Sequence, residues 1–287
     1  MLLATDSIAG AAAPPLEAVE LAAVAAIMQT DARIHLNAGK STLVRSRLAR
    51  RLRERNCAHF RQYVRLVQTD AAERAAMVVA LTTNHTHFFR ENHHFDHLRC
   101  TVRPELEKRA RHRPVRLWSA GCSNGEEVLT LAMCLLGETR AEATWLRQGR
   151  VKLLATDLAP HVVEATRRAI YSAAAVDRVP APYRAAWMHR TDDEWRVPEE
   201  ARSLVTAKVL NLFGPWPMRQ KYDVIFCRNV IIYFDDTAKA ELEARFVDML
   251  APGGYLYIGH SERLIGPAAN TMRQCGQTTY IKPPSAA

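Results

Sequence analysis

Four apolar segments of the sequence end in side chains that could hold a ligand. These side chains belong to Glu126, Glu127, Asp157, Asn211 and Arg228. In nucleotide-binding sheets, an acidic residue after the second strand accepts hydrogen bonds from ribose hydroxyls, and Asp157 has that position. The adjacent carboxylates of Glu126 and Glu127 would repel a phosphate but attract a cation or an ammonium group. The alternative is an ordinary turn whose acidic residues complement the dipole of the following helix.

The elements that position these residues follow from the alternation of apolar and polar segments. A strand is expected at 115–120, a glycine-bearing turn at 121–125 and a helix from Glu126. Further strands are expected at 151–156, 207–210, 222–227, 255–259 and 278–281, with helices from about Pro160 and over 237–250. Alternating strands and helices predict a parallel sheet that binds its ligand at the carboxyl ends of the strands. Because the polar residues all fall at that edge, the pattern favours a ligand site over an ordinary turn.

Composition bounds the class of protein. The chain has 287 residues, 48% of them hydrophobic and 24% charged, enough for one large domain or two smaller ones. No apolar run approaches the roughly 20 residues of a membrane span, and no basic segment of the kind that opens a secretory signal is present. The six cysteines form no C-x-x-C pair, which indicates reduced thiols in a cytoplasmic protein. The formal net charge of +9 indicates an acidic partner: nucleic acid, anionic lipid or an acidic protein surface.

The N-terminal region has helical periodicity and one strongly basic helix. Within 42–67, Arg47, Arg51 and Arg55 recur at i, i+4 spacing beside an apolar stripe. Since Glu54 is the only acid among the arginines of this helix, they are expected to repel one another, which favours an anionic partner. A solvated face is the alternative.

Residues 81–97 contain five histidines around Arg90. No glutamate follows His93 as in a zinc-protease helix, and no second ligand cluster occurs, so no metal site is predicted. Arg90 lies among phenylalanines, and a guanidinium held against rings is suited to bidentate binding of a carboxylate. A surface arginine whose stem lies along apolar residues is the alternative.

Four stretches taken together resemble the CheR family of chemotaxis-receptor methyltransferases, and the resemblance extends from about residue 20 to 282. The stretches are 81–90, 118–127, 226–234 and 259–262. The resemblance implies an α/β fold: a Rossmann-like S-adenosylmethionine-dependent methyltransferase sheet with a small inserted β-subdomain, preceded by an all-helical N-terminal domain. The implied division is a helical receptor-docking domain at 1–80, a linker at 81–112 that contributes to the cofactor site, and a methyltransferase domain at 113–287 with an insertion at about 171–206.

The resemblance also implies roles for individual residues. Cofactor contacts are implied for Asn84, Thr86, Arg90, the pair Glu126 and Glu127, Asp157, Asn211, Leu212, Arg228 and Asn229. Which glutamate of the pair contacts the cofactor stays open at this point. Arg90 and Tyr233 are implied to lie beside the transferred methyl group. The helix that carries Arg47, Arg51 and Arg55 is implied to dock on the receptor.

The implied activity is methylation of glutamate side chains on the cytoplasmic methylation helices of chemoreceptors, with S-adenosylhomocysteine as the second product. Some family members bind a C-terminal pentapeptide of the receptor through a glycine-bearing loop in the inserted subdomain. The corresponding residues 190–197 are few and contain no glycine, which predicts methylation independent of that peptide. A monomer is expected, acting without nucleic acid and without inserting into the membrane.

Two other functions share some of these features. A nucleic-acid methyltransferase would have the same fold, cofactor and basic charge. Enzymes that methylate base nitrogens often have an Asn/Asp-Pro-Pro-aromatic turn after the fourth strand, where this chain has Arg228-Asn229-Val230-Ile231. A non-catalytic adaptor would bind the cofactor or the receptor alone, and Arg90 and Tyr233 argue against it.

Overall fold

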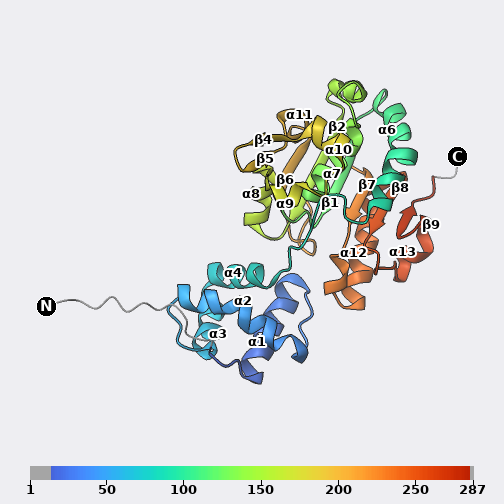
Figure 1. Ribbon diagram of the computed structural model, residues 1–287. Helices are drawn as coiled ribbons and strands as arrows, with labels where there is room; N and C mark the ends of the chain where they lie inside the picture. Colours follow the sequence, from blue (N-terminus) through green and yellow to red (C-terminus); the bar gives the residue numbers. More distant parts are fainter. Residues whose placement is uncertain (1–13, 285–287) are drawn as a thin grey trace. The chain divides into compact units, whose positions relative to one another are not determined.

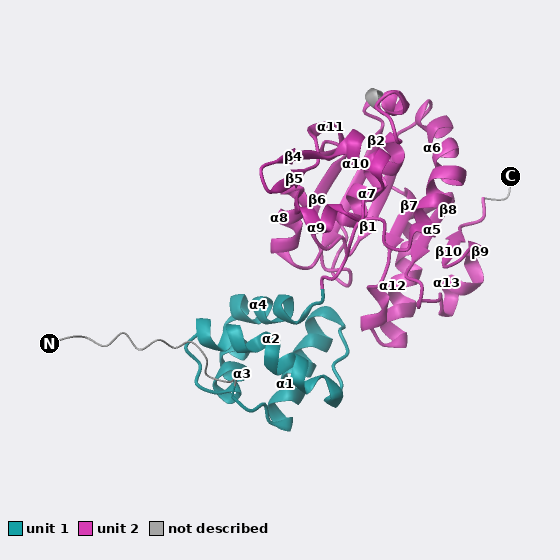
Figure 2. Cartoon of the chain, in the orientation of Figure 1, with its two compact units in different colours: residues 1–83 teal, residues 84–287 magenta. Residues whose placement is uncertain are grey.

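The computed structural model describes residues 14–284, apart from the side chains of residues 147 and 148. The chain divides into two compact units, Met1–Thr83 and Asn84–Ala287 (Figures 1 and 2). The segment 84–112 therefore belongs to the unit that contains the large sheet. None of the helices between residues 14 and 284 combines the length and hydropathy that a bilayer-spanning helix requires.

The first unit is all-helical, as predicted. Its elements are α1 (Ala18–Ala32), the 3-10 helix η1 (Ala38–Lys40), α2 (Ser41–Glu54), α3 (Phe60–Thr69) and α4 (Ala71–Leu81). The i, i+4 stripe of Val44, Leu48 and Leu52 is buried and forms part of the core. Asp70 caps α4, because its side chain accepts a hydrogen bond from the Glu73 N–H at 3.0 Å.

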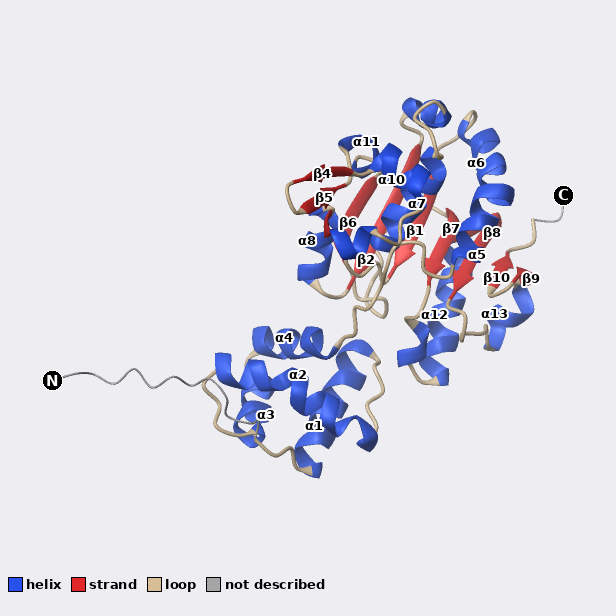
Figure 3. Ribbon diagram, viewed as in Figure 1, coloured by secondary structure: helices blue, strands red, loops and turns tan. Residues whose placement is uncertain are grey.

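The second unit is built on a seven-stranded sheet with the order β6-β2-β1-β7-β8-β10-β9 (Figure 3). The strands are β1 (Val115–Ala120), β2 (Val151–Asp157), β6 (Val205–Val209), β7 (Tyr222–Cys227), β8 (Leu250–Ile258), β9 (Arg273–Gly276) and β10 (Thr279–Ile281). The strands from β6 to β8 in this order are parallel, whereas β10 and β9 are antiparallel to their neighbours. The order reverses at β1, and open α/β sheets bind ligands at the carboxyl ends of the strands at such a reversal.

Helices cover both faces of this sheet because successive strand residues point to opposite sides. Leu117 of β1 and Phe226 of β7 belong to one core cluster with Leu131 of helix α7. The next residue of β1, Trp118, packs edge to face on Phe246 of α12, with ring centroids 5.4 Å apart. The helices outside the insertion are α5 (Asn92–His97), the π-helix η2 (Leu98–Val102), α6 (Arg103–Ala110), α7 (Glu126–Leu136), η3 (Glu142–Gln148), α8 (Pro160–Arg168), η4 (Ile231–Tyr233), α12 (Asp236–Met249) and α13 (Gly266–Thr271).

A small subdomain is inserted between β2 and β6. It contains a three-stranded antiparallel sheet of order β3-β5-β4, formed by β3 (Ile170–Ser172), β4 (His189–Thr191) and β5 (Glu194–Arg196). Three short helices accompany it: α9 (Ala173–Val176), α10 (Ala181–Trp187) and α11 (Glu199–Arg202). The family resemblance predicts this subdomain correctly. Residue periodicity alone does not, because strands of three residues are too short to show alternation.

The predicted element bounds are correct at the centre of the sheet and wrong at its edges. The bounds of β1 and β7 and the start of α7 agree with the sequence prediction. Strand β6 begins two residues earlier than predicted, and β9 is not predicted at all. Strand β8 begins at Leu250, five residues earlier than predicted, because the chain passes directly from α12 into the strand and Pro252-Gly253-Gly254 lies within the strand.

Candidate functional site

The turn between β1 and α7 depends on left-handed backbone angles. The φ angle is 85° at Gly121 and 96° at Gly125. A Cβ atom on Gly121 would lie 2.4 Å from Cγ2 of Val230, so a glycine is needed for the loop after β7 to approach this turn. The turn is therefore shaped for close packing of backbone at the carboxyl edge of the sheet.

Asp157 ends β2 directly beside this turn. Its Oδ2 accepts a hydrogen bond from the Ser123 N–H at 2.9 Å, and its Oδ1 accepts one from the Ala159 N–H at 3.0 Å. The side chain is nearly buried, and burial raises its pKa despite these bonds. Each oxygen keeps a lone pair for a further donor, such as a ribose hydroxyl. The Ser123 hydroxyl donates to the Asn84 carbonyl at 2.8 Å, which brings the start of this unit to the same turn.

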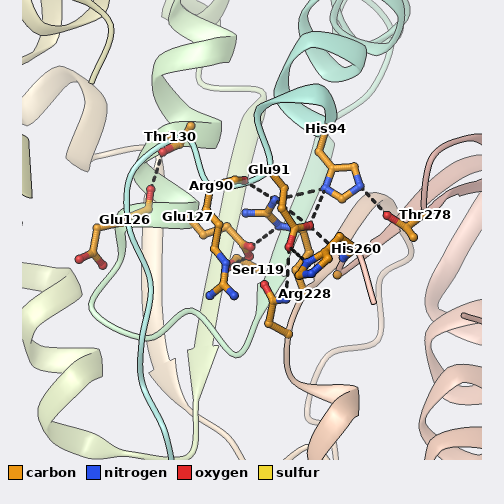
Figure 4. Close-up of polar contacts among 12 residues, drawn as sticks. Arg90, Glu91, His94, Ser119, Glu126, Glu127, Thr130, Arg228, His260 and Thr278 are labelled. Atoms are coloured by element: carbon orange, nitrogen blue, oxygen red, sulfur yellow. Dashed lines mark hydrogen bonds and ion pairs between the residues drawn. The ribbon is translucent and has the colours of Figure 1, made fainter. Parts of the chain in front are cut away.

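Glu126 and Glu127 are both buried in the first turn of α7, but their surroundings differ. Glu127 accepts hydrogen bonds from the Ser119 hydroxyl and from Nε of Arg228, both at 2.7 Å. Oε2 of Glu126 is buried without a hydrogen-bond partner in the described part of the chain, and burial raises the pKa of this carboxyl. Figure 4 shows its carboxylate pointing away from Glu127 and Arg228. Since an unpaired buried carboxylate is costly, Glu126 is the member of the pair that is suited to an ammonium group.

The Arg228 guanidinium is the centre of a buried network at the end of β7. Its side chain is only 2% exposed. Nη1 donates to the Arg90 carbonyl at 2.6 Å and lies 3.2 Å from Nδ1 of His94. The guanidinium lies over the rings of Phe95 and Phe226, with its carbon 5.0 and 5.5 Å from the two ring centroids. Arg228 thus joins the segment before β1 to the sheet and to Glu127.

His94 is neutral in this network. Burial and the neighbouring charge of Arg228 lower its pKa to about 3. Because Arg228 can only donate, Nδ1 of His94 is the acceptor and the ring proton lies on Nε2. Nε2 is 3.0 Å from Oγ1 of Thr278 and 3.1 Å from the Gln277 carbonyl, so the ring connects the end of β7 to the turn before β10.

Two carboxylates fasten the loop after β7, and neither was predicted as a site residue. Glu262 accepts hydrogen bonds from the N–H groups of Gly259, Asn229 and Ile232, the last two at 3.2 and 3.1 Å. Glu91 accepts from Nδ2 of Asn229 at 3.2 Å. The only sequence signal for Glu262 is its place in the family stretch 259–262. A Cβ on Gly259 would lie 2.7 Å from Nδ2 of Asn229, which explains the glycine.

Non-glycine residues with left-handed backbone angles concentrate at this edge. The φ angles are 53° at Phe89, 56° at Glu91, 50° at Ser123 and 58° at Asn229. Each such residue costs about 1–2 kcal/mol relative to an ordinary conformation. Strain of this kind persists where surrounding contacts determine the backbone, and it is typical of functional sites.

The two predicted catalytic side chains, Arg90 and Tyr233, are partly exposed. Nη1 of Arg90 donates to the His85 carbonyl at 2.9 Å, which leaves further N–H groups for a ligand. Tyr233 lies in η4, after the carboxyl end of β7. Among residues 14–284, its hydroxyl takes no part in the network around Arg228. Both side chains can therefore present polar groups to a substrate.

The remaining predicted cofactor residues lie along the same edge. Asn211 and Leu212 follow β6, and the N–H of the preceding Leu210 donates to the Asp157 carbonyl at 2.9 Å. Oδ1 of Asn211 accepts from the Phe213 N–H at 3.0 Å. Thr86 lies between Asn84 and Arg90 and is partly exposed. The predicted site residues fall into two groups. Asn84, Thr86 and Arg90 lie in the segment before β1. Those that follow the carboxyl ends of β1, β2, β6 and β7 are Glu126, Glu127, Asp157, Asn211, Leu212, Arg228, Asn229 and Tyr233.

The basic helix α2 differs from the sequence interpretation. The expectation that its arginines repel one another is wrong, because acids from outside the helix pair with them. Arg51 pairs with the buried carboxylate of Glu73, and Arg55 pairs with Asp70 at 2.8 Å. Arg47 donates to the Leu81 and Thr82 carbonyls, both at 2.8 Å, and so caps the carboxyl end of α4. Each of these three arginines therefore stabilises the helical unit itself.

Comparison with known proteins identifies the family. The CheR methyltransferase all-alpha domain matches residues 20–82, and the CheR methyltransferase SAM binding domain matches residues 84–281. The chain belongs to the CheR methyltransferase family. It is 41% identical over 261 residues to the probable chemotaxis protein methyltransferase of Rhizobium etli, covering 88% of this chain and 96% of that protein. It is 38% identical over 252 residues to chemotaxis protein methyltransferase 2 of Pseudomonas aeruginosa, covering 86% and 87% of the two chains. For the chemotaxis protein methyltransferase of Escherichia coli the identity is 37% over 251 residues, with coverage of 84% and 82%.

This CheR protein is a methyltransferase with S-adenosylmethionine as its cofactor. The residues present fit that molecule. A buried carboxylate with an unpartnered oxygen, at Glu126, suits the ammonium group of its methionine part. The open lone pairs of Asp157 suit its ribose hydroxyls.

Proposed function

We propose that this CheR protein transfers the methyl group of S-adenosylmethionine to glutamate side chains of chemoreceptors, forming glutamate methyl esters and S-adenosylhomocysteine. Proteins named as chemotaxis methyltransferases align with it over most of their lengths, which supports the substrate class. The main structural support for the cofactor site is the unpartnered oxygen of Glu126, which lies at the same sheet edge as Asp157. A cationic nucleoside is the ligand class that would satisfy both.

In the proposed cofactor site, Asp157 accepts from the ribose hydroxyls and Glu126 accepts from the ammonium group. Glu127 is assigned to holding Arg228, because its carboxylate is already paired with that guanidinium and with the Ser119 hydroxyl, whereas Glu126 has an oxygen without a partner. The other residues proposed to line the cofactor are Asn84, Thr86, Arg90, Asn211, Leu212, Arg228 and Asn229. Arg228 would contact the cofactor through its backbone, because its guanidinium is buried in the ion pair with Glu127.

The proposed reaction needs no general base. A free glutamate has a pKa of about 4.3, so the nucleophilic carboxylate is already ionised at neutral pH. When bound, the cofactor supplies a methyl group activated by its sulfonium. The protein's own contribution is then proximity and orientation, which can lower a barrier by roughly 7–11 kcal/mol.

Arg90 and Tyr233 are the side chains proposed to aim the receptor carboxylate. The guanidinium has free N–H groups, and the hydroxyl of Tyr233 can donate one hydrogen bond. Neither should hold the carboxylate tightly, because a fully paired carboxylate is a poorer nucleophile. The strained backbone and the network around Arg228 fix the segments that carry these two residues.

We retain helix α2 as the proposed docking surface for the receptor's methylation helices, although its guanidinium groups are not equally available. Arg47, Arg51 and Arg55 make the internal contacts described above. Arg45 and Arg53 are exposed, and neither has an ion-pair partner within residues 14–284. Long-range attraction to an acidic receptor surface would therefore come mainly from Arg45 and Arg53.

Methylation is proposed to be independent of a C-terminal receptor pentapeptide. Strands β4 and β5 are joined by only two residues, Asp192 and Asp193, and Asp192 adopts the left-handed conformation that a glycine would otherwise take (φ 52°). The hairpin therefore has no longer loop that could enclose a peptide. Methylation rates of receptors with and without the pentapeptide should agree within about twofold. A clear dependence on the peptide would contradict this part of the proposal.

The activity is tested with S-adenosylmethionine labelled in its methyl group and membranes that contain chemoreceptors. Label should appear on the receptor and should be released by mild base as methanol, because a glutamate ester hydrolyses there. Matched membranes whose receptors carry alanine at the methylation glutamates should gain no label. Base-stable label on the receptor, or label on added RNA, would contradict the proposal.

A further inference from the structure

Glu91 is a nearly buried carboxylate that no step of the proposed transfer uses. Its side chain is 10% exposed. Oε1 accepts from Nδ2 of Asn229 at 3.2 Å and lies 2.8 Å from Nδ1 of His260, while Oε2 accepts from the His260 N–H at 3.1 Å. Arg228 and His94 lie 3.8 and 3.6 Å away. Figure 4 shows Glu91 between these groups, so a single carboxylate joins the loops after β7 and β8 to the segment before α5.

The contacts of Glu91 fix the residue that directly follows Arg90. Phe89 and Glu91, the two residues that flank Arg90, both have left-handed φ angles. The Arg90 carbonyl accepts from Arg228 Nη1 at 2.6 Å, and the next side chain along the chain is the one fastened to Asn229 and His260. A backbone this unusual persists only when surrounding contacts determine it. Loss of those contacts would let the segment relax and would move the Arg90 side chain.

The surroundings of Glu91 favour its ionised form. Burial acts to raise its pKa, but the hydrogen bond to His260 and the charge of Arg228 outweigh burial, and the pKa lies below its ordinary value. A charged acceptor makes stronger hydrogen bonds than an amide oxygen does. Replacement by glutamine would also turn an NH₂ group towards the donors of Asn229 or His260.

We propose that Glu91 is a positioning residue for the methyl transfer: its carboxylate fixes the backbone of Arg90 against the loops after β7 and β8, so that the Arg90 guanidinium stays where the substrate carboxylate arrives. This inference rests on the proposed role of Arg90. Glu91 touches neither substrate nor cofactor in this account. We assign its effect on the rate to Arg90, and the Kd of the cofactor reports any effect through Asn229, which it also contacts.

The expected effect of Glu91→Gln is a loss of rate that is much larger than the loss of cofactor binding, because Arg90 and Asn229 are two of several residues proposed to line the cofactor. The single-turnover rate should fall about tenfold, because misplacement of an orienting group by a fraction of an ångström has effects of that order. The Kd for S-adenosylhomocysteine should change less than about twofold. His260→Ala removes one contact of Glu91 from the exposed side and should lower the rate about threefold without unfolding the protein. Glu142→Gln is the matched control, since Glu142 also accepts several hydrogen bonds but lies beyond the other end of α7.

A double-mutant cycle with Arg90→Ala decides between positioning and general stabilisation. The proposal predicts that Glu91→Gln and His260→Ala lower the rate in the wild-type background but have no further effect once Arg90 is alanine. Equal fold losses in both backgrounds would overturn the positioning role while leaving the proposed function intact. A wild-type rate for Arg90→Ala alone would instead refute the role of Arg90 in the proposed function, and the positioning role with it.

Discussion

Each unit of this protein contains a buried network of arginine and carboxylate groups, and the two networks differ in completeness. In the helical unit, the buried carboxylate of Glu73 accepts from Arg51 and from the Tyr63 hydroxyl at 2.6 Å, with Arg55 at 3.4 Å. Arg51, Tyr63 and Glu73 lie on the regular helices α2, α3 and α4, and Arg55 directly follows α2. In the sheet unit, Glu127 and Arg228 pair at 2.7 Å, but the neighbouring Glu126 has an unpartnered buried oxygen.

The backbone separates the networks in the same way. Four left-handed non-glycine residues, Phe89, Glu91, Ser123 and Asn229, lie around the second network, whereas the first has Asn56, directly after Arg55. A satisfied network held mainly by helices stabilises a fold, whereas an unsatisfied one on strained loops leaves a place for a ligand. Both networks are buried and charged, so burial and charge alone do not mark a functional site. Hydrogen-bonding groups without partners and a strained backbone distinguish the network at the site from the other one.

The largest expected difference is between the adjacent residues Glu127 and Glu126. Glu127→Gln should lower the free energy of unfolding of the sheet unit by about 3 kcal/mol, because it removes the closer charge partner of the buried Arg228 and leaves Glu91 at 3.8 Å. Glu126→Gln should leave that free energy unchanged or raise it by about 1 kcal/mol, since it removes a poorly satisfied buried charge, and it should weaken cofactor binding. Urea unfolding of both variants provides the measurement. Equal destabilisation would mean that the two carboxylates are not distinct.

Arg90→Ala should separate activity from stability. Methyl transfer should fall by a factor of about 100 or more, because an orienting group is lost. The free energy of unfolding should change by less than about 1.5 kcal/mol, because among the described residues the side chain makes one hydrogen bond, to the His85 carbonyl. Both quantities are measured on the same preparation. Incorporation of label near the wild-type level would remove Arg90 from the reaction.

Charge reversal on α2 sharpens the comparison within the helical unit. The double variant Arg45→Glu and Arg53→Glu should weaken receptor binding about tenfold at low salt while leaving cofactor affinity and stability unchanged. Arg51→Glu should instead destabilise the helical unit, because it places a second carboxylate beside buried Glu73. If the double variant bound receptor as well as wild type, α2 would be a solvated face and not a docking surface.

The smallest expected effect is a pH dependence that comes from His94. Its pKa of about 3 in the folded protein lies below that of an unfolded histidine, so the unfolded chain gains a proton first as the pH falls. Stability is therefore lost below pH 6.5, by about 1 kcal/mol between pH 6.5 and pH 5.5. Burial raises the pKa of Glu243 to about 7, which acts in the opposite direction, so the observable is the difference between wild type and His94→Gln. Parallel stability curves for the two proteins would contradict the assignment of a neutral buried His94.

Much of the fold was predictable because its signals are local. The strand at 115–120, the turn and the helix from Glu126 are consecutive in the chain, and apolar runs mark β2 and β7. The place of Asp157 at the carboxyl end of a strand follows from the same pattern. The strands β3, β4 and β5 could not be found in this way, because three residues carry no periodicity.

The partners of charged side chains were not predictable, because they come from distant parts of the chain. Glu73 lies 22 residues beyond Arg51, and no spacing rule connects them. Glu127 and Arg228 are 101 residues apart, so the sequence could not tell that one glutamate of the pair is already used. The role of Glu91 is not predictable from the sequence for the same reason, since its partners lie 138 and 169 residues further along the chain.

The central claim is that the carboxyl edge of the sheet, with the unused capacity of Glu126 and Asp157, holds the methyl donor. A crystal structure of the protein with S-adenosylhomocysteine tests it most directly. We expect the ammonium group within hydrogen-bond distance of the Glu126 carboxylate, and the ribose hydroxyls within the same distance of Asp157. Density for the nucleoside away from the ends of β1, β2 and β7, or an ammonium group bound by Glu127, would contradict the account.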